Sequence, residues 1–506
     1  MATILLSAAG AAVGAGFGGT VLGLSGAVIG RAIGATVGRA IDQRLLGTGS
    51  RAVETGKVDR FRLTGASEGA PIGQVWGRMR VAGQVIWASR FQEATTVTRT
   101  GGKGATRQPS VTTTQYSYSV SMALALCQGA ITRVGRIWAD GVEISPASLT
   151  MRVYVGDETQ LPDPKIEAVE GTGMVPAYRG LAYVVLEDLD LTPFGNRVPQ
   201  FSFEVIRPAQ GPLVGGAADL IRGVKGVALI PGTGEYALAT TPVHLAQGIG
   251  RNVSANVHSP SGATDFSASL RALEEELPSC GSVSLVVSWF GDDLRCGACA
   301  IKPKVESRAI DGTPMPWRAG GIARAQADEV VRLAGRPVYG GTPADAAVIE
   351  AINALRGKGK AVMFYPFVLM DQLAGNGCTD PWTGAADQPP LPWRGRITLS
   401  AAPGRVGSPD RTAAAAAEVA QFFGSAQAGH FSTVGGLVSY GGPAEWSYRR
   451  FILHYATLCA MAGGVDAFCI GSELRGLTSV RGAGDVFPAV SALRQLAADV
   501  RAILGP

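Results

Sequence analysis

The chain has 506 residues, too many for one ordinary hydrophobic core, so roughly two to four domains are expected. Only 17% of the residues are charged and 69 are glycines, yet 46% are hydrophobic, which excludes a disordered chain and favours one rich in turns or hidden in an assembly. The net charge of +5 gives no signature of nucleic-acid binding. Cys296 and Cys299 lack a second pair at zinc-finger spacing, so we interpret the cysteines as ordinary thiols, with convergence of Cys280 and Cys378 on this pair as the alternative. Neither a metal nor another cofactor is expected.

The N-terminal segment, residues 1–46, is apolar and glycine-rich, and Ile4 to Gly30 is an uncharged run long enough to span a bilayer. On a helix, glycines at every fourth position form a groove without side chains, against which another helix packs closely. These glycines are Gly10, Gly14, Gly18, Gly26, Gly30, Gly34 and Gly38. We interpret the segment as glycine-zipper helices packed inside an assembly, with transient membrane insertion and permanent membrane anchoring as the alternatives. No Lys or Arg precedes the apolar run, which disfavours a secretory signal.

Residues 47–215 are predicted to be β-rich. Apolar and polar side chains alternate from Tyr116 to Leu124, and the pattern returns at Leu149–Val155 and Phe201–Val205, as expected of half-buried strands. The pair Asp140-Gly141 supplies the residue types of a tight turn.

Residues 216–506 alternate between apolar runs and helical patterns, which predicts a parallel sheet or barrel. Thr342 is expected to cap one helix, with Pro343 at its first position, and Asp410 is expected to cap another. The expected strands, about four between Ser282 and Pro506, include 282–289, 360–364 and 467–471, and the expected helices are 321–333, 342–357, 410–423, 448–463 and 488–503. About four strands make half of an eight-stranded barrel, so we expect the barrel to continue beyond this chain or to be completed by another element.

Side chains suited to sugar chemistry follow these strands at their carboxyl ends, where barrel active sites lie. The carboxylates are Asp292, Asp293, Asp371 and Glu473, and the rings on which a sugar would stack are Trp382, Trp393 and Tyr365. Cleavage of a glycosidic bond needs two carboxyl groups about 5 to 9.5 Å apart. The competing interpretation is structural. In it, Asp292 and Asp293 cap the next element or pair with Arg295, Glu473 bonds to Arg475 or to a neighbouring backbone group, and the two tryptophans hold their loop in place.

Three segments of the β-rich region resemble the tail-tip and hub proteins of long-tailed phages. They are residues Pro71–Trp87, Tyr118–Gly141 and Pro176–Val205. The resemblance implies a module that builds the ring closing the tail tube, usually as a homotrimer. Its partners would be the distal tail, hub and tape measure proteins, and DNA would be only cargo passing through the channel.

The C-terminal region is similar to the TIM-barrel-like domain of the large baseplate protein of gene transfer agents, often called megatron. The residues that carry this resemblance are Leu229–Glu235, Ser288–Arg295, Val338–Asp345, Tyr365–Asp371 and Phe468–Arg475. The resemblance implies a glycoside-hydrolase-like fold that is only partly contained in residues 216–506.

Together these patterns predict a multidomain α+β virion protein at the tail tip or baseplate, taking part in host attachment and DNA delivery. A tail-associated glycoside hydrolase with Glu473 as acid is the alternative, its substrate a cell-wall or surface glycan. A bacterial membrane protein anchored by residues 4–30 is the third hypothesis. The sequence leaves enzymatic activity open because it supplies no complete catalytic pair, and it lacks the motifs of proteases, kinases and hydride-transfer enzymes.

Overall fold

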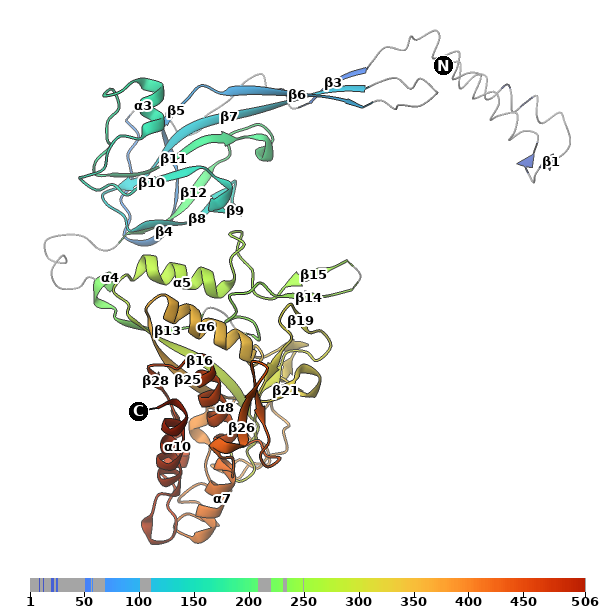
Figure 1. Cartoon of the computed structure of the whole chain (residues 1–506), viewed down its shortest axis with the longest axis vertical. Coiled ribbons are helices and arrows are strands. Elements are labelled where there is room, and N and C mark those ends of the chain that lie inside the picture. Colours follow the sequence, from blue (N-terminus) through green and yellow to red (C-terminus); the bar gives the residue numbers. More distant parts are fainter. Residues whose placement is uncertain are drawn as a thin grey trace.

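The computed structural model describes residues 69–100, 111–207, 220–230, 234–248 and 250–505, together with a few short stretches before residue 58. These residues form a β-rich body and a mixed α/β body, which Figure 1 shows one above the other. The buried side chains of the two bodies form separate hydrophobic clusters.

Most of the glycine-rich segment, including all seven glycines of the predicted groove, lies outside the described residues. Ala9 and Ala12 are helical, whereas β1 (Thr20–Val21) and β2 (Leu24–Ser25) pair as antiparallel strands. The prediction of helix is therefore wrong at β1 and β2, where β-branched Thr20 and Val21 favour an extended backbone. None of the helices in the described part of the chain is long and apolar enough to cross a membrane.

Two sheets make up the β-rich body. One has the order β10–β11–β7–β3, with β5 and β6 also paired to β7, and the other has the order β4–β12–β8–β9. The strands are β3 (Arg51–Thr55), β4 (Gly77–Ala82), β5 (Gln84–Ala88), β6 (Gln92–Thr100), β7 (Val111–Gln128), β8 (Arg133–Ala139), β9 (Val142–Ile144), β10 (Met151–Tyr154), β11 (Leu181–Asp190) and β12 (Phe201–Arg207). The predicted strands near residues 149–155 and 201–205 are thus confirmed. Asp140 and Gly141, with φ of 50° and 84°, form the predicted turn between β8 and β9.

Strand β7 belongs to both a core and an extended arm. Its N-terminal half pairs with β6 and β3 in a long ribbon that projects from the body in Figure 1. From Val120 to Cys127 both of its faces are buried, rather than the single face that the alternation predicted. The second face is covered because Ala123 packs with Tyr183 and with Ile166 of helix α3 (Pro164–Glu170).

Asp163 fixes helix α3 to the sheet. Its carboxylate is fully buried, accepts hydrogen bonds from Arg152 and Tyr154, and caps the helix through the backbone N–H groups of Lys165 and Ile166. Burial opposes ionisation of Asp163, but the hydrogen bonds from Arg152 and Tyr154 hold the pKa of this carboxyl below its usual range. The carboxylate is therefore the form that stabilises this part of the body.

The α/β body is built on four parallel strands in the order β13–β16–β25–β28. They are β13 (Gly226–Leu229), β16 (Ser282–Gly291), β25 (Ala361–Met370) and β28 (Ala467–Phe468). The accompanying helices are α5 (Asp265–Glu276), α6 (Asp345–Gly357), α7 (Ala413–Phe423), α8 (Tyr448–Met461), α9 (Arg475–Thr478) and α10 (Pro488–Leu504). The predicted alternation of strands and helices is confirmed, and within the described residues the parallel strands form only part of a barrel.

Burial alternates along the two long strands of this sheet. Leu285 and Trp289 of β16 and Phe364 of β25 are fully buried in the core that also contains α6 and α8. The other face carries Val286 and Tyr365, which are only half-buried. This difference is expected when helices cover one face of a sheet and loops cover the other only in part.

Three predictions in this body are wrong. Residues 321–333 form short strands and a single 3-10 turn, because Gly320 and Gly321, with φ of 62° and 79°, turn the chain in a hairpin. Helix α6 begins at Asp345, since the hydroxyl of Thr342 instead donates to Ser288 and accepts from the N–H of Lys304.

Helix α7 begins after Thr412, whose hydroxyl accepts from the N–H of Ala414. The predicted cap, Asp410, forms an ion pair with Arg481 at 2.6 Å.

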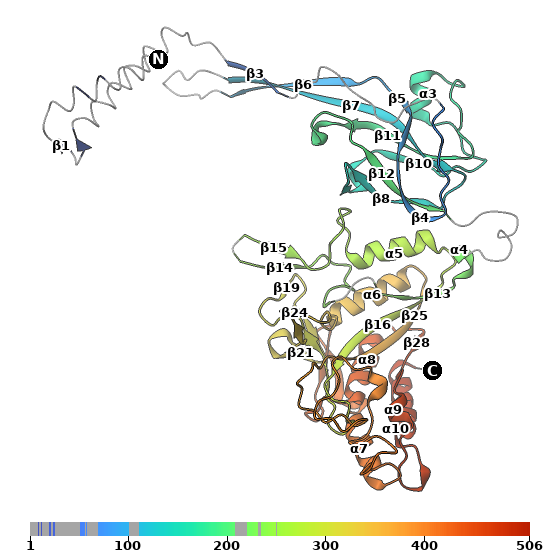
Figure 2. The same ribbon diagram turned by 180° about the vertical axis from the view of Figure 1, so that it is seen from behind.

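The two bodies meet through an ionic contact. Arg133 on β8 forms ion pairs with Glu275 and Glu276 of α5, at 2.7 and 2.6 Å, and Arg78 on β4 also pairs with Glu276. Figures 1 and 2 show α5 between the β-rich body and the parallel sheet from opposite sides. Partly exposed pairs contribute about 0 to 1 kcal/mol each, so this contact orients the bodies more than it stabilises them.

Asp163→Asn is expected to lower the free energy of unfolding of the β-rich body by about 2 kcal/mol at pH 7, because it removes the buried charge to which Arg152 and Tyr154 donate, although Glu187 remains as an ion-pair partner of Arg152. Because the pKa of Asp163 is depressed, its stabilisation is present above the usual aspartate pKa and is lost as the pH falls below it. The variant should therefore lose less stability than the natural chain on acidification from pH 6 to pH 3. Hydrogen exchange of the β7 and β11 amides in urea measures both effects, with exposed Glu158→Gln as the control. Equal acid sensitivity of Asp163→Asn and the natural chain would contradict this account.

Candidate functional site

Asp293 and Asp371 lie where two strands of the parallel sheet end, but both are already paired with cations. Asp293 follows β16 and is 5% exposed. Its carboxylate forms an ion pair with Arg295 at 2.6 Å and accepts a hydrogen bond from the Gln388 side chain at 2.7 Å. Burial opposes the charge on Asp293, but the contacts with Arg295 and Gln388 hold the pKa of the carboxyl below its usual range. Ionised Asp293 therefore holds the loop that contains Gln388 in place. Its contact with Arg295 agrees with the structural interpretation, in which these two residues pair.

Asp371 follows β25 and is also engaged. It is 1% exposed, and its two oxygens lie 3.0 and 2.9 Å from the ammonium nitrogen of Lys304. A carboxylate closed in by a cation in this way has no free face for a substrate, so the structure does not support a catalytic role for Asp371.

Glu473 differs from both aspartates because its side chain is about half exposed. Its carboxylate accepts a hydrogen bond from the indole N–H of Trp393 and lies 3.1 Å from the guanidinium of Arg394. The predicted pairing with Arg475 is wrong, and Arg394 takes that place. The backbone φ of Glu473 is +56°, an uncommon conformation for this residue type that is often found at functional positions. The structure thus joins the predicted acid to one predicted sugar-stacking ring.

A hollow of about 480 Å³ lies beside this contact. It is lined by Trp382, Trp393, Gly395, Arg396, Pro403, Arg475, Gly476 and Ser479. We call it the two-tryptophan hollow. Both predicted tryptophans line it, whereas the third predicted ring, Tyr365, packs against Phe367 on the half-buried face of the sheet.

Cys296 and Cys299 pack as small apolar groups. Both thiols are buried and free, and burial raises the pKa of Cys296 to about 12. Within the described ranges, no group of three or more His, Cys, Asp or Glu side chains is arranged to hold a metal ion.

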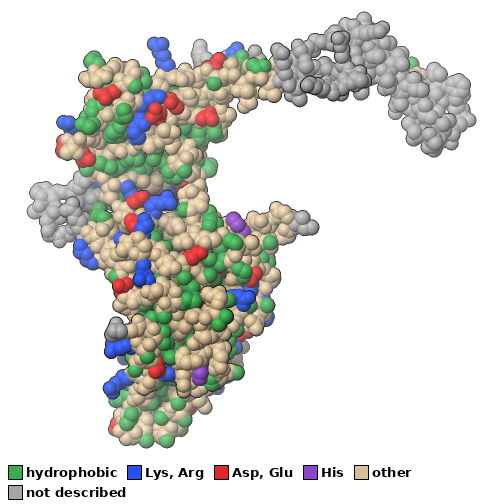
Figure 3. Space-filling view, viewed as in Figure 1, with side chains coloured by type: hydrophobic (Ala, Val, Ile, Leu, Met, Phe, Trp, Pro, Cys, Tyr) green, Lys and Arg blue, Asp and Glu red, His purple; other side chains and the backbone are tan. Residues whose placement is uncertain are grey.

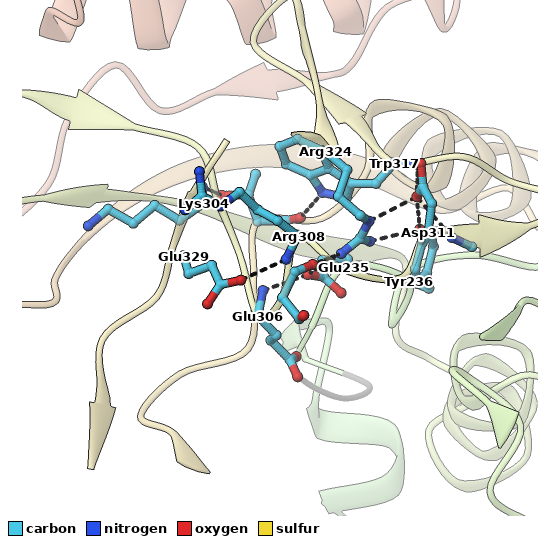
Figure 4. A network of polar contacts seen from close by, with 12 residues as sticks. Glu235, Tyr236, Lys304, Glu306, Arg308, Asp311, Trp317, Arg324 and Glu329 are labelled. Carbon is cyan, nitrogen blue, oxygen red and sulfur yellow. Dashed lines mark hydrogen bonds and ion pairs between the residues drawn. The ribbon is translucent and has the colours of Figure 1, made fainter. Parts of the chain in front are cut away.

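A buried polar network above the sheet was not predicted from the sequence (Figure 4). The guanidinium of Arg324, 5% exposed as a side chain, donates to Asp311 at 2.9 Å, to the Tyr236 hydroxyl at 3.0 Å and to Glu235 at 3.3 Å. Glu235 also accepts the backbone N–H of Glu306. Burial, together with the negative charge of Glu235, raises the pKa of Glu306.

This network ties together segments that are distant along the chain. Glu235 and Arg324 are 89 positions apart, and no periodicity or motif relates them. The network explains why residues 321–333 are not helical, since Arg324 must turn inward between two acidic partners.

The comparisons with known proteins agree with the predicted resemblance. Residues 446–506 match a family described as the GTA TIM-barrel-like domain. A solved structure described as "Virion of native gene transfer agent (GTA) particle" has a chain 61% identical to this one, covering 45% of this chain and 44% of that chain, with a TM-score of 0.27. This chain therefore matches less than half of that relative's length. No curated protein matches. The resemblance to gene transfer agent proteins is confirmed.

Arg324→Met is expected to lower the free energy of unfolding by about 3 kcal/mol, because it leaves the buried carboxylate of Glu235 without its cation. Chemical denaturation of the full chain at pH 7 measures the loss. The matched control is Arg336→Met, at an exposed position in the same segment between β16 and α6. The structural role of the network would be refuted by similar small losses in both variants.

Glu473→Ala is expected to release the indole of Trp393, because its N–H loses the carboxylate that fixes it. In protein labelled with fluorotryptophan, the fluorine resonance of Trp393, assigned with Trp393→Phe, should narrow and move toward its position in unfolded protein. Asp485→Ala, at an exposed carboxylate, is the control. A Trp393 resonance identical in both variants would show that Glu473 does not hold the ring.

Proposed function

We propose that this chain is a structural component of a gene transfer agent virion, placed in the baseplate or tail tip. The observation that carries the proposal is the 61% identity to a chain of a native gene transfer agent particle. The family match over residues 446–506 supports it independently. A location in the virion follows from this similarity, and the position at the tail tip is part of the proposal.

The β-rich body is suited to building a ring. Its β6–β7 ribbon, joined by β3, projects well beyond the core in Figure 1 and offers backbone edges to a neighbouring copy. Such an arm would let each copy hold the next around the tail axis, most simply as a homotrimer. The distal tail, hub and tape measure proteins are the proposed neighbours.

The surface of the described residues fits a role in an assembly. In the face shown in Figure 3, acidic and basic side chains are interspersed over both bodies without a continuous basic stripe. DNA would accordingly meet this protein as passing cargo and not as a bound ligand. The glycine-rich N-terminal segment would line the channel or enter the host membrane during delivery.

Glycan hydrolysis is a weaker interpretation of the same site. Two of the four candidate carboxylates, Asp293 and Asp371, are neutralised by Arg295 and Lys304. Glu473 would then need a second carboxyl group across the scissile bond. The neighbouring rings favour contact with sugar, so host-surface binding is the part of this hypothesis that the geometry supports.

Electron microscopy of purified particles tests the proposal. We expect threefold density at the tail tip into which the β-rich body fits, with the β6–β7 ribbon contacting an adjacent copy. Particles carrying a tag inserted at residues 101–110, between β6 and β7, should show extra density at that contact. Normal particles that lack this chain, or density in the head alone, would refute the placement.

A further inference from the structure

We propose that the two-tryptophan hollow binds an acidic saccharide, with Trp382 and Trp393 as stacking walls and Arg475 as the group that binds the ligand's carboxylate. This inference goes beyond the structural role in the virion and does not depend on it. It also requires no catalysis, since only binding groups are assigned.

The walls of the hollow are fixed before any ligand arrives. The indole N–H of Trp382 donates to the backbone oxygen of Arg396 at 2.7 Å, and that of Trp393 donates to Glu473. The N–H group of each indole is therefore already hydrogen-bonded, yet Trp382 and Trp393 remain 38% and 48% exposed. Exposed indole surface with its N–H already bonded is suited to the apolar C–H face of a sugar ring.

Two glycines allow this arrangement. A Cβ atom at Gly395 would lie 2.4 Å from the ring of Trp393, so that ring rests directly on the backbone. A Cβ atom at Gly476 would lie 2.7 Å from the backbone oxygen of Ile397, so the floor of the hollow has no room for a side chain. The rings are thus held by close backbone contact as well as by hydrogen bonds, which reduces the entropy lost on binding.

The charge lining the hollow is positive. Arg475 is exposed, and in the described part of the chain it makes no ion pair, whereas Arg396 is only loosely paired with Asp380 at 3.4 Å. No acidic residue belongs to the described lining. A guanidinium without an ion-pair partner beside an aromatic wall matches a planar carboxylate, to which it can donate two parallel hydrogen bonds.

The volume of the hollow and the small number of its charges favour a saccharide over a nucleic acid. The volume of about 480 Å³ lies within the range of about 300 to 1,000 Å³ that is usual for small-ligand sites. Single-stranded nucleic acid is normally held by a groove of cations that follows its backbone. Only Arg396 and Arg475 provide charge here, which suits one or two acidic groups on a short sugar segment.

The test compares binding of two probes to the full chain by titration calorimetry: oligogalacturonate and a neutral galactose oligosaccharide of equal length. We expect oligogalacturonate to bind about tenfold more tightly than the neutral probe at low salt, since one charge-assisted hydrogen-bonded pair is worth about this factor. Arg475→Gln should remove this preference while binding of the neutral probe persists. Trp393→Ala should weaken binding of both probes at least tenfold.

The controls are Arg494→Gln and Trp76→Ala, which alter exposed residues of the same types away from the hollow and should leave both affinities unchanged. Thermal unfolding of each variant verifies that its fold is intact. Equal affinities for the two probes, an unchanged preference in Arg475→Gln, or no detectable binding of either probe would overturn the proposal. Binding of an oligothymidylate as tight as that of oligogalacturonate would also overturn it, in favour of a nucleic-acid ligand.

Discussion

The parallel pairing of β16 with β25 is the constraint on which the α/β body depends. The two strands run in register from Ser282–Ala361 to Gly291–Met370 without a shift. Because parallel strands need long crossover connections, the chain between them must leave and re-enter the sheet on fixed sides. Every loop that follows a strand therefore emerges at one edge, and this is where the polar residues of the region gather.

Most charged groups at that edge are paired with one another within the fold. Asp293 with Arg295, Asp371 with Lys304, and Arg324 with Glu235 and Asp311 are each matched within the fold. Matched buried charges hold loops in place, but they offer little to a substrate. The groups still available to a ligand lie farther out, where Trp382, Trp393 and Arg475 meet solvent.

The β-rich body follows a different principle. Strand β7 is its central element, because one end of the strand packs in the hydrophobic core and the other end pairs with β6 in the projecting ribbon. Because one strand runs through both the core and the ribbon, a contact made by the ribbon acts on the same strand that stabilises the core. The connection to the α/β body is weaker, since it consists of partly exposed ion pairs from Arg78 and Arg133 to α5.

Local patterns in the sequence were sufficient for much of the secondary structure. The alternation around Val120, the turn at Asp140-Gly141 and the apolar run of β16 depend on neighbours in the chain, and each predicted its element correctly. The pairing of Asp293 with Arg295 likewise depends on residues only two positions apart. Only the tertiary structure decided that α3 buries the second face of β7, that Arg324 turns inward to Glu235, and that Glu473 holds Trp393 with Arg394 beside it. These contacts join residues that are distant along the chain, and their energies depend on burial and on partners that no local pattern contains.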